Sequence, residues 1–161
     1  MMLSDVDIEE SILSGRLVID PYDPTALQPA SLDMRLGEGF SVPGTGSEGR
    51  LWLPTGRLVL GHTLEYVKIP DDLAARVEGK STWGRRGLQV HLTAGFIDPG
   101  FQGQITLELL NVSGHTLFLK PGSPIAQLSF HRLTSSARRP YGSPELGSHY
   151  QDQRGATPPY E

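Results

Sequence analysis

One segment of the chain, residues 79–87, combines glycines, hydroxyl groups and three cations. It consists of Gly79, Lys80, Ser81, Thr82, Trp83, Gly84, Arg85, Arg86 and Gly87. Backbone N–H groups and cations that converge in this way can bind a phosphate group. The alternative is a charged turn that faces water, which is the usual place of charged residues. The segment alone does not decide between the two.

The run Gly79-Lys80-Ser81 resembles the end of a P-loop, a motif that has another glycine five residues before this one. Position 74 is alanine, and the surrounding sequence shows no strand-to-helix pattern. We therefore reject a P-loop and keep phosphate binding by the loop itself as the functional interpretation.

Two acidic residues adjoin apolar strand candidates. Asp98 precedes Pro99 and Gly100, a pattern for which a turn-forming Asp is the common interpretation. Glu108 lies in the alternating segment 104–111 and can simply face water there. Ile105, Leu107 and Leu109 lie on one face of that segment, and Thr106, Glu108 and Leu110 lie on the other. The functional alternative for Glu108 is a general base whose pKa is raised by apolar neighbours.

Short strands would position these residues, since brief apolar runs alternate with Gly and Pro turn signals. We expect strands at 16–19, 32–36, 51–53, 57–60, 63–67, 74–78, 88–93, 104–111, 116–119 and 125–131. Near the N-terminus, Ser4 fits a helix N-cap and Gly15 a stop. The pattern predicts a mostly β sandwich, barrel or jelly roll with a short N-terminal helix, in a single domain over residues 1–161. Residues 140–161, polar and rich in Gly and Pro, predict an extended arm that needs a partner surface to become ordered.

Composition excludes several classes of protein. The chain has no cysteine, so disulfides, thiolate metal sites and the H-x-E…P-C-x-x-C signature of zinc deaminases are excluded. A net charge of -4 gives no general attraction for nucleic acid. The acidic N-terminus and the lack of an apolar run of ~20 residues predict no signal peptide and no membrane span, so we expect a cytoplasmic protein. His91, on an apolar strand candidate, is interpreted as a hydrogen-bonded core residue.

Seen together, these segments resemble the dCTP deaminase family of the dCTP deaminase and dUTPase superfamily. Matching motifs run through nearly the whole chain in family order. They are Leu3-Ser4-Asp5, Gly15-Arg16-Leu17, residues 28–37, 79–85 and 94–101, Thr106-Leu107-Glu108, Pro121-Gly122 with residues 125–128, and Arg139-Pro140-Tyr141 with Tyr150, Gln153 and Gly155. Each motif is weakly specific alone, and their common order carries the resemblance. Gly95, Phe96 and Gln127 look like the pattern of bifunctional members, which form dUMP.

The resemblance implies a distorted jelly-roll (dUTPase-like β-clip) fold. It further implies a homotrimer with active sites between subunits, where the C-terminal arm closes over the nucleotide. The implied reaction is hydrolytic deamination of dCTP at cytosine C4 to dUTP and ammonia, without zinc, followed by hydrolysis to dUMP and pyrophosphate. Mg²⁺ would be bound through the triphosphate, since a hard cation prefers oxygen ligands.

The resemblance also implies residue roles. Glu108 would be the general base, while Ser81 and Arg85 would place the water and stabilise the tetrahedral intermediate. Asp98 would bind the deoxyribose 3′-hydroxyl and orient the water that attacks the α-phosphate. The residues implied to bind substrate are Lys80, Ser81, Thr82, Trp83, Gly84, Arg85, Asp98, Thr106, Leu107, Glu108, Gln127, Tyr141, His149 and Gln153.

Some features depart from the family pattern. The chain is shorter between Gly37 and Arg57, Trp83 stands where a Leu is usual, and His149 stands where a Lys is usual. Two alternatives stay open: a dUTPase without deaminase activity, and a non-catalytic, nucleotide-binding regulatory protein. The sequence also leaves open whether dTTP acts as a feedback inhibitor.

Overall fold

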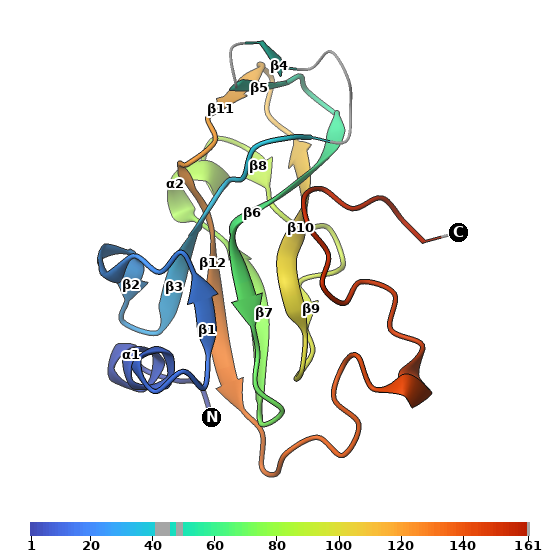
Figure 1. Cartoon of the computed structure of the whole chain (residues 1–161). Helices are drawn as coiled ribbons and strands as arrows, with labels where there is room; N and C mark the ends of the chain where they lie inside the picture. The colour runs from blue at the N-terminus through green and yellow to red at the C-terminus, as the bar shows by residue number, and fades with distance from the viewer. Residues whose placement is uncertain (41–45, 48–49, 161) are drawn as a thin grey trace.

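Most of the chain forms β-strands whose alternating side chains bury one face. The computed structural model describes residues 1–40, 46–47 and 50–160. The prediction of a mostly β fold with a short N-terminal helix is confirmed (Figure 1). The segment between Gly37 and Arg57, where the chain is shorter than the family pattern, lies partly outside the described residues, as does the last residue of the predicted arm.

Helix α1, Asp5–Leu13, begins where the sequence predicts it. The Asp7 N–H donates to Ser4 Oγ (3.3 Å), and the Ser4 N–H donates to Asp7 Oδ2 (3.2 Å), so the first turn has a reciprocal capping box. The helix ends before Gly15, whose φ of 73° is a conformation that glycine adopts without strain. Local chemistry therefore sets both ends of this helix.

The strands form three antiparallel sheets. The four-stranded sheet has the order β1 (Val18–Asp20), β6 (Leu58–Lys68), β10 (Gln102–Asn111), β8 (Leu88–Gln89). The five-stranded sheet has the order β2 (Leu27–Gln28), β3 (Ser31–Arg35), β12 (Pro124–Arg132), β7 (Leu73–Gly79), β9 (Phe96–Ile97). The small sheet has the order β11 (Leu117–Leu119), β5 (Arg50–Leu53), β4 (Gly46–Ser47). Three short helical segments complete the elements: η1 (Pro24–Ala26), α2 (Ser81–Gly84) and η2 (Pro144–Leu146).

The two larger sheets share one apolar core. Buried side chains of the four-stranded sheet, such as Leu107 and Val67, belong to the same cluster as Leu32, Val77 and Leu128 of the five-stranded sheet. Along β10 the odd-numbered residues are buried and the even-numbered ones are only half-buried. This strand therefore presents Thr106 and Glu108 on the face away from the core, as its alternation predicts.

Three predicted strands and one predicted loop differ in the structure. The segments 57–60 and 63–67 form one strand, β6, in which Gly61 leaves room for Leu109; a Cβ there would lie 2.8 Å from Leu109 Cδ1. The expected strand 88–93 ends at Gln89. The helical turn α2 directly follows β7, so the statement that no strand-to-helix context exists around residues 79–87 is wrong. One turn of helix and the alanine at position 74 still do not make a P-loop.

The C-terminal arm lies along its own chain. Gln153 pairs in parallel with Gly103, while the Asp152 N–H donates to Gln102 O (2.8 Å) and the Gln104 N–H to Gln153 O (3.0 Å). The partner surface expected for the arm is therefore β10 of the same chain in this structure. Figure 1 shows the arm and α1 on opposite sides of the strands.

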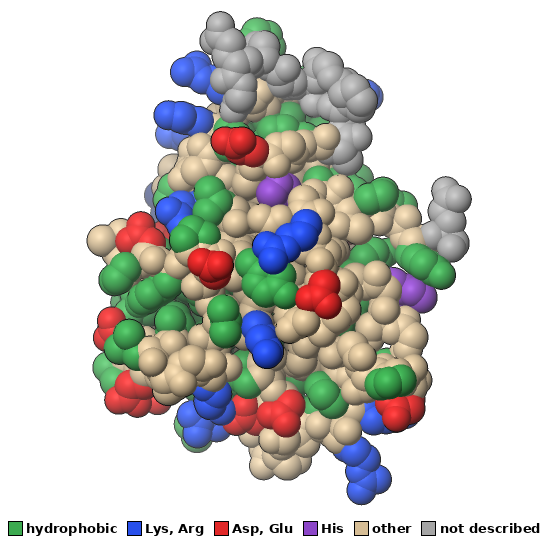
Figure 2. All heavy atoms as spheres, viewed as in Figure 1, with side chains coloured by type: hydrophobic (Ala, Val, Ile, Leu, Met, Phe, Trp, Pro, Cys, Tyr) green, Lys and Arg blue, Asp and Glu red, His purple; other side chains and the backbone are tan. Residues whose placement is uncertain are grey.

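Charge is distributed without a dominant patch on the face drawn in Figure 2. Acidic and basic side chains are interspersed there, in keeping with the small net charge of -4. Phosphate binding on this face would therefore depend on a few local cations rather than on a broad basic surface.

Candidate active site

The carboxylate of Glu108 is held by backbone N–H groups from a neighbouring loop. Its Oε2 accepts hydrogen bonds from the N–H of Leu92 (2.6 Å) and of Thr93 (3.2 Å). These donors follow β8, which explains why the strand expected at 88–93 stops early. Beyond Gln89 the N–H groups of Leu92 and Thr93 bond to the carboxylate.

The pKa of Glu108 is lower than its ordinary value. Burial raises this pKa, but hydrogen bonds from the backbone N–H groups of Leu92, Thr93 and Ala94 lower it. The charge of His91 lowers it further. The prediction of a raised pKa is therefore wrong, because the sequence showed the apolar neighbours and not the backbone donors. Glu108 is a carboxylate at neutral pH, which is the form that a general base needs.

His91 belongs to the same site, although the sequence did not indicate it. Its side chain is half-buried, and its Nδ1 is buried without a hydrogen-bond partner among the described residues. The interpretation of His91 as a hydrogen-bonded core residue is therefore wrong. Its ring packs so closely on Gly95 that a Cβ there would lie 2.9–3.1 Å from three ring atoms. Gly95 is thus required for the close approach of His91 to the loop that binds Glu108.

A pocket of about 670 Å³ opens in front of Glu108. Six residues that the family resemblance implied in the site line it: Phe96, Asp98, Thr106, Glu108, Tyr141 and Gln153. Apolar side chains, including Leu58 and Leu60, cover another part of the wall. The arm closes one side, where the Thr157 N–H donates to Thr106 Oγ1 (3.3 Å). The pocket therefore combines a carboxylate, hydroxyl groups and an apolar surface, as a nucleoside site requires.

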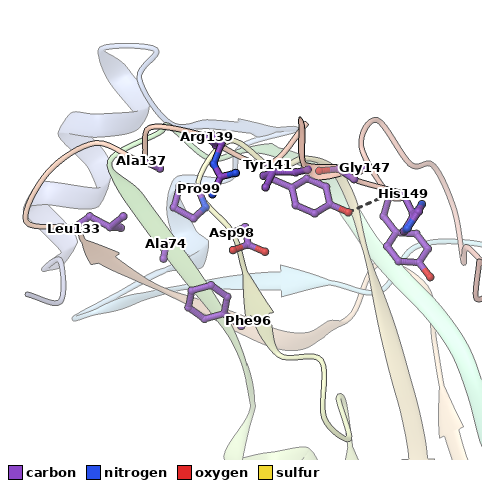
Figure 3. A pocket seen from close by; sticks show the side chains of 13 residues that line it. Ala74, Phe96, Asp98, Pro99, Leu133, Ala137, Arg139, Tyr141, Gly147 and His149 are labelled. Carbon is purple, nitrogen blue, oxygen red and sulfur yellow. Dashed lines mark hydrogen bonds between the residues drawn. The ribbon is translucent and has the colours of Figure 1, made fainter. Parts of the chain in front are cut away.

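A second pocket, of about 710 Å³, lies between the strands and the arm (Figure 3). It shares Phe96, Asp98 and Tyr141 with the first pocket and adds Arg139 and His149. In Figure 3, Asp98 lies between the Phe96 and Tyr141 rings. The two pockets are therefore neighbours, and the second adds cationic or titratable groups to the first.

The arm holds itself in place around both pockets. The Tyr150 N–H donates to Tyr141 Oη (3.0 Å), and the Tyr160 N–H donates to Tyr150 Oη (3.0 Å). The rings of His149 and Tyr160 stack with centroids 4.0 Å apart. His149, which the resemblance implies at the triphosphate, thus contacts an aromatic ring in this conformation.

The cation-rich segment 79–87 lines neither pocket. Lys80 forms an ion pair with Asp33, and Gln127 donates to Gly79 O (3.3 Å). Ser81, Thr82, Gly84 and Arg85 are exposed on the turn α2 and at its end.

The implied site residues therefore fall into two sets within one chain. Lys80 and Gln127 lie on the side of α2, where they contact Asp33 and Gly79, whereas Asp98 and Glu108 line the pocket against β10. Leu107 belongs to neither set, because its side chain lies fully buried in the core.

Metal ligands are not gathered in the part of the chain that the structure describes. No three His, Asp or Glu side chains come together there. Mg²⁺ that is bound through phosphate oxygens and water needs no such cluster. The residues of the pocket are therefore compatible with a cation that arrives bound to a triphosphate. Within the same residues, no helix is both long and apolar enough to cross a membrane.

Comparisons with known proteins identify the family of this chain. A family profile described as dCTP deaminase-like matches residues 2–50 and 44–133. A Nocardioides protein named dCTP deaminase, dUMP-forming, is 48% identical over 98% of this chain and 94% of its own length. A protein of the same name from Mycolicibacterium vanbaalenii is 49% identical over 98% of this chain and 94% of its own length.

Solved structures show the same fold at low sequence identity. The 2′-deoxycytidine 5′-triphosphate deaminase of Agrobacterium tumefaciens matches with a TM-score of 0.67 and 23% identity, over 81% of this chain and 47% of that one. This chain thus spans about half the length of that protein. A dUTPase from phage phi11 of S. aureus matches with a TM-score of 0.55 and 15% identity, over 75% of this chain and 93% of that one. The distorted jelly roll is shared by both, and with relatives nearly half identical over almost the whole sequence, this chain belongs to the dCTP deaminase-like family.

Proposed function

We propose that this protein hydrolyses dCTP to dUTP and ammonia, and then hydrolyses dUTP to dUMP and pyrophosphate. The observation that carries the proposal is the Glu108 carboxylate, held by two backbone N–H groups in a pocket that also contains Asp98. Relatives about 48% identical are named dCTP deaminase, dUMP-forming. Each step consumes one water molecule.

In the deamination, Glu108 acts as the general base. The N–H groups of Leu92 and Thr93 both bond to Oε2, so in this proposal Oε1 takes the proton from water as the hydroxide oxygen attacks C4 of cytosine. Glu108 passes this proton to N3 and then transfers the proton of the new C4 hydroxyl to N4, so that C4=O forms as the C4–N4 bond breaks and ammonia leaves. Proton transfer of this kind contributes about 10²–10⁴ to the rate.

A neighbouring subunit of a homotrimer completes the site in this proposal. The support is the separation of the two residue sets: Ser81 and Arg85 lie on α2, outside the pocket that Glu108 and Asp98 line. A second copy of the chain would bring its α2 to this pocket, where Ser81 holds the attacking water and Arg85 binds the phosphates and stabilises the charge of the tetrahedral intermediate.

Asp98 has two roles in the proposal. It binds the 3′-hydroxyl of the deoxyribose and orients the water that attacks the α-phosphate of dUTP. Its support is its exposed position where the two pockets meet, between the nucleoside side and the side with Arg139 and His149. Mg²⁺, bound through the triphosphate, would neutralise the charge that develops on the phosphate oxygens.

Product analysis tests the proposal directly. The protein is incubated with dCTP and Mg²⁺, and the nucleotides are separated by ion-exchange chromatography. We expect dUMP from the wild type, no deamination by Glu108→Gln, and normal turnover by Glu10→Gln, whose carboxylate is exposed on α1.

Other outcomes correct or overturn the proposal. Accumulation of dUTP alone removes the second step. If dCTP stays intact, the deaminase proposal fails, and the same assay with dUTP separates a plain dUTPase from a non-catalytic binder.

A further inference from the structure

The indole of Trp83 tethers the helical turn α2 to a neighbouring strand. Its Nε1–H donates to the carbonyl oxygen of Pro124, at the start of β12 (3.0 Å). The ring is half-buried and packs against the apolar core. A single helical turn is marginal by itself, and the N-cap residue Lys80 makes no side-chain capping bond. The Trp83 hydrogen bond therefore connects this turn to β12, in addition to the backbone hydrogen bonds within the turn.

The three cations of the segment differ in their contacts. The guanidinium of Arg86 lies over the Trp83 ring, 5.1 Å from its centroid, within the range of a cation–π interaction. Lys80 forms an ion pair with the largely buried carboxylate of Asp33. Arg85 is exposed and makes no ion pair or ring contact with any described residue.

We infer that Trp83 is a positioning residue of the phosphate-binding turn, which holds Arg86 away from the nucleotide and leaves Arg85 as the cation that α2 offers to the triphosphate. The inference rests on the proposed function, because it concerns the phosphate contacts of that site. Arg85 and Arg86 thus have different roles, although they are adjacent in the sequence.

The chemistry of position 83 distinguishes this arrangement from the family pattern, in which a Leu is usual there. Leucine can neither donate to Pro124 O nor attract a cation through a π system. Phenylalanine keeps the ring but not the N–H donor. Trp83→Phe therefore removes only the hydrogen bond to Pro124. Trp83→Leu removes both this hydrogen bond and the cation–π contact with Arg86.

Steady-state kinetics with dCTP and Mg²⁺ test the inference on the full-length protein. We expect Arg85→Gln to raise KM about tenfold or more, as for a lost charge-assisted bond, and Arg86→Gln to change KM less than about twofold. Trp83→Phe should raise KM by about two- to tenfold with a smaller change in kcat, as for one lost hydrogen bond.

A double-mutant cycle separates positioning from simple structural support. In the Trp83→Leu background Arg86 is released toward the phosphates, so adding Arg86→Gln should raise KM there although it is nearly silent in the wild type. The inference is overturned if Arg86→Gln raises wild-type KM as much as Arg85→Gln does, or if Arg86→Gln changes KM equally in the wild type and in Trp83→Leu. Thermal unfolding of each variant identifies any loss of folding.

A binding measurement keeps this test apart from the test of the enzyme activity. The chain has two tryptophans, so Trp52→Phe leaves the Trp83 fluorescence as the sole indole signal. We expect inorganic tripolyphosphate to change this emission, and Arg85→Gln to abolish the change while Arg86→Gln preserves it. If dCTP is not turned over but this pattern appears, the proposed function fails and the role of Trp83 stands; if dCTP is turned over and both variants behave alike, the role of Trp83 fails.

Discussion

The N–H of Leu92 donates a 2.6 Å hydrogen bond to Oε2 of Glu108, and through it the loop after β8 fixes the carboxylate on β10. The Thr93 N–H adds a second bond to the same oxygen. One carboxylate oxygen is therefore engaged by backbone, and the side chain is oriented before any substrate arrives, which lowers the entropy cost of reaching the reactive geometry.

Activity should persist to acid pH. The folded-state pKa of Glu108 lies below its ordinary value: burial raises it, but backbone hydrogen bonds outweigh that effect. The acid limb of kcat/KM in the unliganded enzyme should therefore lie below the ordinary range of a glutamate. The stabilisation from these bonds should be complete above the unfolded-state pKa and lost as pH falls through the folded-state pKa. A pH–rate profile with an acid limb above the ordinary glutamate range would contradict this assignment.

Replacing His91 should move the acid limb of kcat/KM to higher pH. The charge of His91 is one cause of the lowered pKa of Glu108, so His91→Asn removes an interaction that favours the carboxylate. We expect the acid limb of kcat/KM to shift to higher pH in this variant. His115→Asn, at an exposed position outside both pockets, is the matched control and should leave the profile unchanged. If the acid limb does not shift in His91→Asn, His91 does not contribute to the lowered pKa of Glu108.

Two glycines with similar backbone angles should respond differently to alanine. Gly100 (φ 87°) and Gly122 (φ 80°) both adopt left-handed conformations, which cost about 1–2 kcal/mol for alanine. A Cβ at Gly100 would also lie 2.5 Å from Pro140 Cβ, whereas nothing lies within 4 Å of a Cβ at Gly122. Gly100→Ala should therefore loosen the arm, and Gly122→Ala should not.

Limited trypsin digestion followed by mass spectrometry measures this difference. Cleavage after Arg154, which lies over the Tyr66 ring in the ordered arm, should be faster in Gly100→Ala than in Gly122→Ala. Equal cleavage rates in the two variants would show that the turn at Gly100 does not anchor the arm.

The helix cap should contribute measurably to stability. Ser4→Ala removes the acceptor of the Asp7 N–H and should lower the free energy of unfolding by about 1 kcal/mol. Urea unfolding at one fixed protein concentration measures it, since association would make stability depend on concentration. Ser135→Ala, at an exposed position after β12, should change the free energy by less than about 0.5 kcal/mol. A loss of the same size in both variants would rule out the cap as its source.

Elements with local signals could be predicted from the sequence. The α1 helix follows from Ser4 and Asp7 at one end and Gly15 at the other, and β10 follows from strict alternation around Glu108. The position of Glu108 on the outward face needed only this period. Short-range chemistry was sufficient in both cases.

Elements that depend on distant partners could not be predicted. The strand β6 looked interrupted at Gly61 and His62, but Leu109 fills the space at the glycine. The buried His62 ring lies within hydrogen-bond distance of the carbonyl oxygens of Thr63 (2.8 Å) and Glu38 (2.5 Å). These contacts let the strand continue, and no local pattern specifies them.

The electrostatics of the site were also beyond the sequence. Apolar neighbours of Glu108 are visible in the alternation, whereas the backbone donors come from a loop that the sequence suggested was a strand. The ion pair of Lys80 with Asp33 likewise joins the N-cap of α2 to strand β3, which are far apart in the sequence. Charge balance at such a site follows from the fold and not from the motif.

Strand β10 has a consequence for how this enzyme family can diversify. Its odd-numbered residues are buried, while Thr106 and Glu108, at even-numbered positions, line the pocket. Mutations along this strand therefore fall into two classes that alternate in the sequence: those that affect the core and those that affect the outward face. Substitutions at Thr106 can therefore change the pocket while Glu108 keeps the chemistry and the buried odd-numbered residues keep the fold.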